Sequence, residues 1–148
     1  MLSFNEFAAF LEGSVARIEP GLVENTEVLM EAVVADARAM FGTYQPGWAP
    51  LAASTLADKT AKGFSPPDNP RLRTGEDRDS VHAEVEADLF GVTGIVGSER
   101  KINMWQELGT ARIPPRPVLG PAMVKVYPVA EFLFGNFAMS LLTPGAAR

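Results

Sequence analysis

The sequence contains no cysteine and only one histidine, His82, among its 148 residues. The absence of cysteine excludes disulfide bonds, thiolate nucleophiles and cysteine-ligated zinc. A single histidine is too little for a histidine-based metal centre or a catalytic dyad. We therefore expect a protein of a reducing compartment that has no enzymatic activity, no cofactor and no metal.

Long apolar runs and an excess of positive charge are also missing. No uncharged apolar segment approaches the roughly 18 residues that a membrane span needs, and the opening MLSFNEF lacks the pattern of a signal peptide. The 13 basic and 18 acidic residues give a net charge of -5, which argues against a DNA-coating protein. These features predict a soluble protein with no membrane partner.

The residues that are present suit one compact domain spanning residues 1–148. Hydrophobic residues make up 47% of the chain and charged residues 21%, which is ordinary globular usage. A chain of this length can bury about two-thirds of the surface that its unfolded form exposes. We therefore expect a single folded domain.

Both ends of the chain have helical patterns. Ser3 and Glu6 form the sequence signature of a capping box, followed by residues at the spacing of one helical face: Phe4, Phe7, Phe10 or Leu11, Ser14, Val15 and Ile18. Glu19-Pro20-Gly21 is expected to break this helix. A second helix is predicted from Leu22 to Phe41, with Gly42 ending it and one side formed by Leu22, Leu29, Ala32, Val33, Ala37 and Met40.

The C-terminal segment from Val118 to Leu142 is apolar enough for a packed helix. Pro128 lies inside it, so we expect a kink or a new helix start there. Residues 143–148 are expected to form a flexible tail.

Between the helical ends, residues 42–80 are predicted to form an extended loop. This stretch holds five of the twelve prolines, and one or two helical turns are expected around Leu51 to Ala61. So long a loop usually has a function, which makes it the first candidate for a contact between subunits.

Alternating residues then predict two strands. The first alternates Val81, Ala83 and Val85 with polar residues, and the second carries Phe90, Val92, Ile95 and Val96. A helical turn with Ile102, Trp105 and Leu108 follows, then an extended proline-rich run over residues 113–117. The expected fold class is α+β: N-terminal helices, a long Pro/Gly-rich loop, a small antiparallel sheet and a C-terminal helix.

Isolated features favour ordinary structural roles. Trp105 is interpreted as a core residue that packs on the face of Ile102 and Leu108. For Trp48 two interpretations stay open: its side chain pins its own loop, or it anchors a contact with another subunit. His82 is predicted to be a surface residue. The acidic pairs Glu84/Glu86 and Asp77/Asp79 are interpreted as charged strand and turn positions, because no further ligands follow at suitable spacing.

An ordered series of motifs covers Gly47 to Pro121. It comprises Trp48-x-Pro50-Leu51-x3-Thr55-Leu56-x2-Lys59, Arg71-Leu72-x-Thr74-Gly75-x4-Ser80, Val96-Gly97-Ser98, Glu107-Leu108-Gly109-Thr110 and Pro114-Pro115-Arg116-Pro117-Val118-Leu119. In order and spacing, the series resembles the virion-morphogenesis proteins of Mu-like phages and the related head–tail joining and tail-completion family. Asp77 and Val118 depart from the family pattern, where an apolar residue and an aromatic are more usual.

The resemblance implies an α+β subunit of an oligomeric ring, commonly hexameric, at the junction of head and tail. Its partners would be further copies of itself and the portal and tail proteins, with DNA passing through the lumen without specific binding. Its location would be the virion, after assembly in the host cytoplasm. Candidate oligomer-interface residues are Trp48, Leu51, Leu72, Thr74, Gly75, Gly109, Thr110, Pro115, Arg116 and Pro117.

Physical arguments support some of these positions. Arg116, between prolines, is expected to pair with a neighbouring subunit's carboxylate, and proline-rich loops lose less entropy on docking. The alternatives are a tail-terminator subunit that caps the tail tube and, from a different class, a small protein-binding adaptor that uses the proline-rich segment.

Overall fold

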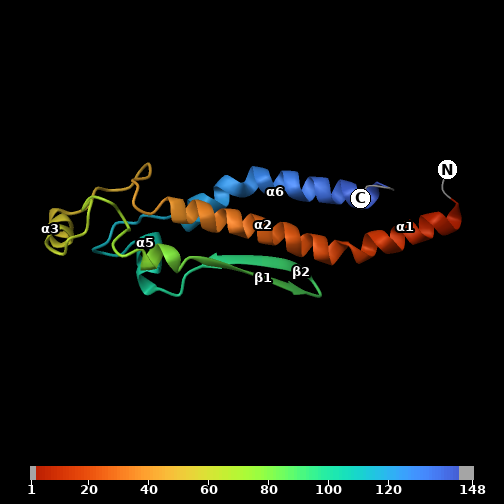
Figure 1. The fold of residues 1–148 in the computed structure, drawn as a ribbon, viewed down its shortest axis with the longest axis horizontal. Helices are drawn as coiled ribbons and strands as arrows, with labels where there is room; N and C mark the ends of the chain where they lie inside the picture. Colours follow the sequence, from red (N-terminus) through yellow and green to blue (C-terminus); the bar gives the residue numbers. More distant parts are fainter. Residues whose placement is uncertain (1–2, 144–148) are drawn as a thin grey trace.

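A computed structural model describes residues 3–143 of the chain. One long helix, α2 (Ile18–Ala39), runs through the middle of an elongated molecule. Helix α6 (Leu119–Leu142) lies along one side of α2, and a hairpin of β1 (His82–Asp88) and β2 (Gly91–Gly97) lies along the other (Figure 1). The α+β class is confirmed, with the helix α2 as the layer between sheet and helix.

The remaining elements lie toward the two ends of the molecule. Helix α1 (Phe4–Ala16) extends from one end of α2. At the opposite end lie α3 (Ala53–Ala61), the single turn α4 (Glu76–Asp79) and α5 (Lys101–Leu108). The expected helical turns around residues 51–61 are therefore present as α3.

The capping box at the start of α1 is confirmed. The Ser3 amide donates to Glu6 Oε2 at 2.7 Å, and the Glu6 amide donates to Ser3 Oγ at 3.3 Å. The expected break at Glu19-Pro20-Gly21 is wrong, because the interruption is the single residue Arg17 and α2 already begins at Ile18. Proline is tolerated in the first turn of a helix, where its missing N–H has no intrahelical partner to lose.

Helix α6 runs without interruption from Leu119 through Pro128 to Leu142, so the alternative of a new start at Pro128 is wrong. An interior proline costs a backbone hydrogen bond, and the packing of α6 along α2 offsets that cost. The expected flexible tail lies, apart from Thr143, outside the described residues.

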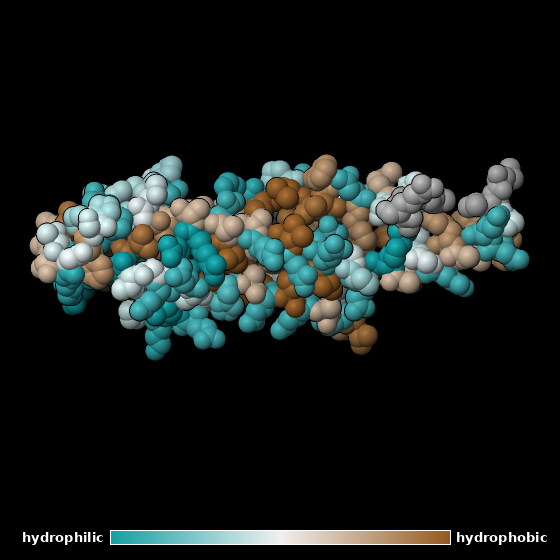
Figure 2. Space-filling model, viewed as in Figure 1, coloured by the Kyte–Doolittle hydropathy of each residue, from teal (hydrophilic) through white to brown (hydrophobic). Residues whose placement is uncertain are grey.

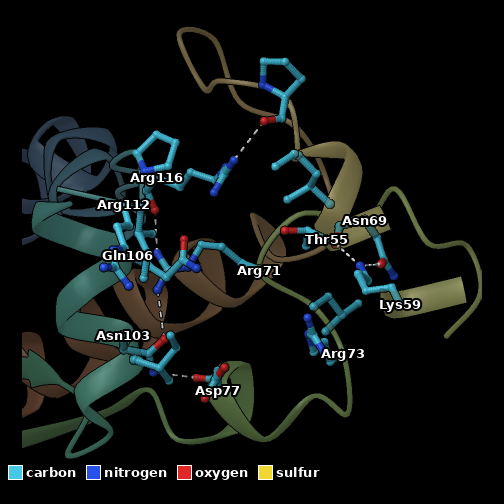
Figure 3. A pocket seen from close by; sticks show the side chains of 17 residues that line it. Thr55, Lys59, Asn69, Arg71, Arg73, Asp77, Asn103, Gln106, Arg112 and Arg116 are labelled. Atoms are coloured by element: carbon cyan, nitrogen blue, oxygen red, sulfur yellow. Dashed lines mark hydrogen bonds between the residues drawn. The ribbon is translucent and has the colours of Figure 1, made fainter. Parts of the chain in front are cut away.

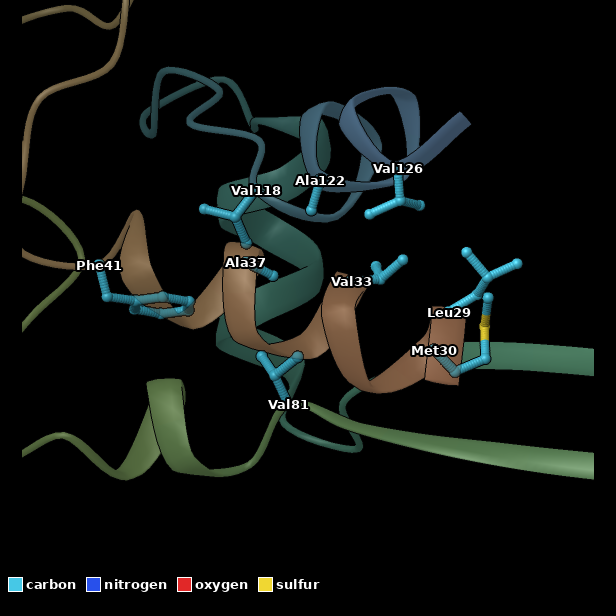
Figure 4. Packing of buried hydrophobic residues seen from close by; sticks show 9 residues of the cluster. All are labelled: Leu29, Met30, Val33, Ala37, Phe41, Val81, Val118, Ala122 and Val126. Carbon is cyan, nitrogen blue, oxygen red and sulfur yellow. The ribbon is translucent and has the colours of Figure 1, made fainter. Parts of the chain in front are cut away.

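The buried apolar core is centred on α2 (Figure 4). One stripe of this helix provides Leu29, Met30, Val33 and Ala37, and Phe41 follows in the turn after its end. Val118, Ala122 and Val126, at four-residue spacing, face it from α6 and its start, and Val81 faces it from the sheet side. Leu29, Val33 and Ala37 belong to the predicted face, whereas Met30 and Phe41 do not.

The hairpin places alternate residues against α2, as predicted. Ala83 pairs with Val96 and Val85 with Gly94, and these positions are half-buried while their neighbours, apart from Gly97, are exposed. A β-carbon on Gly94 would lie 2.6 Å from Met30 Cγ, so the absent side chain allows the sheet to approach the helix closely.

One core assignment is wrong. Trp105 and Leu108 are exposed, and the buried residue of α5 is Asn103. Trp105 and Leu108, three residues apart, lie on the outward side of α5, since the inner side of this helix packs through a polar cluster around Asn103.

Candidate interaction site at the loop end

Residues 42–80 form the predicted long loop, which carries α3 and α4 and is closed at its base by a backbone hydrogen bond. The Gly42 amide donates to the Pro70 carbonyl at 2.8 Å, which closes the segment at its base. Within it, the Tyr44 hydroxyl donates to Asp68 Oδ1 at 2.6 Å and accepts from the Leu51 amide at 3.0 Å. The loop therefore has its own internal hydrogen-bond framework.

Lys59 of α3 is fully buried in this framework. Its Nζ donates to the Asn69 carbonyl at 2.6 Å and to the Asn69 side-chain oxygen. Burial lowers the pKa of Lys59, because desolvation disfavours the charged form. Lys59 thus fastens α3 to the chain segment that returns toward α2.

Arg71 is the centre of a buried polar cluster that joins the loop to α5. Its side chain is 1% exposed and pairs with Glu107, with Nη1 to Oε2 at 3.3 Å. It also donates to the Arg116 carbonyl at 2.7 Å and to Asn103 Oδ1 at 2.9 Å, and its cation lies 4.5 Å from the Phe41 ring centroid. Burial lowers the pKa of Arg71, and the nearby Glu107 partly opposes this shift.

Glu107 caps the start of α6 from another helix. Its Oε2 accepts from the Val118 amide at 2.9 Å, and its Oε1 accepts from the Leu119 and Gly120 amides at 2.8 and 3.2 Å. These amides have no intrahelical partner, and a carboxylate at a helix N-terminus is electrostatically favourable. Glu107 therefore connects the loop cluster to the main helical layer.

Asn103 and Asp77 complete the cluster. The Asn103 amide group donates to the Asp77 carbonyl at 2.9 Å and to the hydroxyls of Ser80 and Ser98 at 3.0 and 2.8 Å. Arg100 Nε donates to the Asp77 carboxylate at 2.5 Å. Asp77 thus has a local role in tying α4 to α5.

The side chain of Arg116 is engaged within its own chain. It is buried, and its guanidinium donates to the carbonyls of Ala49 and Pro50 at 3.0 and 3.2 Å. Its amide donates to the Gln106 carbonyl at 2.6 Å. Arg116 therefore holds the proline-rich run against the loop of its own chain.

Beside this cluster lies a hollow of about 500 Å³, which we call the loop-end hollow (Figure 3). Its lining includes five basic residues and one carboxylate: Lys59, Arg71, Arg73, Arg112, Arg116 and Asp77. Cations remain in excess even when Glu107 and Asp58, which pair with Arg71 and Arg73, are counted. Apolar walls come from Leu51, Leu72, Ile102 and Ile113.

Two polar atoms of the lining residues have no hydrogen-bond partner among the described residues. They are Arg71 Nε and Gln106 Oε1, both buried. The hollow presents apolar side chains together with two exposed cations, Arg73 and Arg112, which suits an acidic and partly apolar binding partner.

The predicted interface residues gather at this end of the molecule, but only Leu51, Leu72 and Arg116 line the hollow. Trp48 is half-buried and packs against the core, as does Leu72. Thr74, Gly75, Gly109 and Thr110 shape turns: both glycines have positive φ, and Thr110 Oγ1 accepts from the Ile113 amide at 3.0 Å. Pro115 is exposed and Pro117 half-buried.

Apart from Arg116, sequence reasoning missed the basic residues of the hollow. Arg71 and Arg112 are each flanked by apolar residues, and a charged residue in such a position was the available signal. Lys59 and Arg73 each have a polar neighbour and carry no such signal, and only folding brings residues 59, 73 and 112 together.

A second kind of surface lies away from the hollow. Large apolar side chains of α1 and α6 are exposed, among them Phe4, Val15, Val124, Tyr127, Phe132 and Met139. Figure 2 shows hydrophobic side chains gathered over α6 in the middle of the molecule. Such contiguous apolar surface is typical of protein–protein contacts.

Comparison with protein-family models, curated proteins and solved structures found no match to this chain. Among residues 3–143, no group of three or more His, Asp or Glu side chains is arranged to hold a metal ion. Within the same part of the chain, no helix combines the length and the apolar character that crossing a membrane requires.

Proposed function

We propose that this protein is a structural subunit of a tailed-phage particle, part of an oligomeric neck or tail-completion ring that joins head to tail. The proposal that the protein is an oligomer rests on its solvent-accessible surface area of 9920 Å². A compact monomer of 15.9 kDa exposes roughly 7,400 Å². The difference of roughly 2,500 Å² lies in the range that obligate subunit interfaces bury.

The distribution of that surface supports the same proposal. Helix α1 has the apolar face that the sequence predicts for burial, yet Phe4, Phe7, Leu11 and Val15 are all exposed. A helix with an unburied apolar face gains little stability from its own chain. Contacts with neighbouring subunits would bury this face.

The assignment to a phage particle rests on the motif series that resembles the Mu-like virion-morphogenesis family. Its residues converge at the loop end, where Arg71, Glu107 and Arg116 form one connected network and Lys59 fastens α3 to Asn69. A ring subunit of this kind would contact the portal and tail proteins, and DNA would pass through its lumen. Its role is structural, without a reaction to catalyse.

The test combines mass in solution with a deletion phage. The purified protein is expected to form oligomers, alone or beside purified heads and tails. A phage that lacks the gene is expected to accumulate full heads and separate tails. Abnormally long tails would instead indicate the tail-terminator alternative, and a protein that stays monomeric beside heads and tails would favour the adaptor alternative.

A further inference from the structure

The tip of the β1–β2 hairpin presents two large apolar side chains to solvent. Leu89 and Phe90 are the residues between the strands, and they are 99% and 96% exposed. The turn is held by Asp88, whose Oδ1 accepts from the amides of Phe90 and Gly91 at 2.7 and 3.1 Å. The conformation of the tip is therefore preorganised by its own hydrogen bonds, which lowers the entropic cost of docking to a partner.

The hairpin carries negative charge beside this tip. Glu84, Glu86 and Asp88 share the face that points away from α2, and all three are exposed. The hairpin tip thus combines an apolar pair with an acidic flank.

The loop-end hollow has the complementary character. Its walls include Leu51, Leu72 and Ile113, and its lining has two exposed cations, Arg73 and Arg112. Arg112 is exposed, and its side chain forms no hydrogen bond or ion pair with any residue from 3 to 143. It is therefore available to pair with a carboxylate of another molecule.

A hairpin cannot reach the hollow of its own chain. The strands run from the region of α5 toward the opposite end of the molecule, so the tip points away from the loop end (Figure 1). We propose that the loop-end hollow receives the hairpin tip of a second copy, with Leu89 and Phe90 against the apolar walls and the acidic flank beside Arg112 and Arg73.

This proposal rests on the proposed function, because it names the contact by which copies of the ring would join. A contact between two different patches is head-to-tail, and repetition of such a contact closes a ring when the rotation fits. Tip and hollow are two such patches on one chain.

The test uses two variants that damage opposite halves of the contact. Leu89→Ser/Phe90→Ser removes the apolar tip at exposed positions, and Ala52→Trp places a large side chain at an exposed position on the rim of the hollow. Sedimentation velocity of the full chain measures association, and circular dichroism checks the fold. Each variant alone is expected to associate at least tenfold more weakly than the wild type.

A mixture of the two variants distinguishes tip-in-hollow docking from any other contact. In an equimolar mixture, the intact tip of one variant meets the intact hollow of the other, so a species of two chains is expected that grows no further. Folded single variants that assemble like the wild type would overturn the proposal while the ring function stands. A mixture that stays monomeric would also overturn it, and a wild type that stays monomeric beside heads and tails would refute the proposed function itself.

Charge reversal gives a second test with smaller changes. Arg112→Glu and Glu86→Lys are each expected to weaken association, and the two together in one chain are expected to restore most of it. Lys101→Glu, at an exposed position that does not line the hollow, is the matched control. Equal loss in the control, or no rescue in the double variant, would contradict the charge pairing.

Discussion

The two ends of the molecule contrast in how regular structure relates to burial. The loop end has short helices and many prolines, yet it buries the side chains of Arg71, Asn103 and Arg116 in a connected hydrogen-bond network and that of Lys59 against Asn69. The opposite end has the long regular helices α1 and α6, yet much of their apolar surface is exposed. Apolar periodicity therefore indicates burial within the chain in α2 but not in α1.

The physical reason lies in what each end needs for its stability. A segment without regular backbone pairing must satisfy its polar groups through side chains, and at the loop end Arg71 and Glu107 do this. A helix satisfies its own backbone, so its apolar face can remain open for a partner. The loop end is expected to depend on internal contacts, and the helical end on assembly.

The largest expected effect comes from breaking the loop-end network. Arg71→Ala removes a side chain that is 1% exposed and leaves Glu107 without its cation and the Arg116 carbonyl without its donor. Removing one partner of a buried ion pair costs about 3 kcal/mol or more. Chemical denaturation should show a loss of about 3 kcal/mol in the free energy of unfolding.

Arg73→Ala is the matched control for this change. Arg73 lies two residues away and pairs with Asp58, but its side chain is 44% exposed. An exposed pair contributes at most about 1 kcal/mol. Equal losses for the two variants would show that burial at Arg71 has no special role.

A second prediction concerns the close contact between α2 and α6. A β-carbon on Gly21 would lie 2.1 Å from Phe137 Cε2, so Gly21→Ala forces the ring to move. Overpacking of this kind costs about 1–3 kcal/mol. Gly135→Ala in α6 meets nothing within 4 Å and should instead stabilise by about 0.5–1 kcal/mol. Thermal unfolding of the two variants should show shifts of opposite sign.

The pH dependence of stability tests the burial of Lys59. Burial lowers the folded-state pKa below the ordinary value of 10.5. Between the lowered value and 10.5, the unfolded chain binds more protons, so stability rises with pH across this window. The wild type should therefore gain stability relative to Lys59→Met as pH rises through the window. A constant difference between the two proteins would mean that the Lys59 pKa is unchanged by folding.

The smallest expected effect on folding is at the exposed face of α1. Phe4 is 84% exposed, and Val15 shares the same open face. Phe4→Ser/Val15→Ser should change the free energy of unfolding by less than about 0.5 kcal/mol while weakening self-association. A large loss of stability in the monomer would show that this face is buried within the chain.

Much of the fold follows from local sequence patterns. The capping box at Ser3, the helix ending near Gly42 and the alternation of the hairpin are local signals, and the structure confirms them. Pro20 and Pro128 misled the prediction of helix boundaries, because tolerance of proline depends on its position in the helix and on tertiary packing.

The candidate site was less predictable. Residues 59, 71, 107 and 116 are far apart in sequence, and no periodic pattern reports a polar cluster formed by tertiary contacts. Trp105 shows the converse error, since its apolar spacing is typical of burial but marks an exposed face. The partners of Arg116 within the chain, the Ala49 and Pro50 carbonyls, were not predictable either, because they are backbone groups that any sequence provides.

The mass of the purified protein in solution tests the central claim most directly. A ring subunit should sediment as a closed oligomer, a fixed multiple of 15.9 kDa, or reach that state when purified heads and tails are added. A chain that remains a stable 15.9 kDa monomer under both conditions would contradict the account.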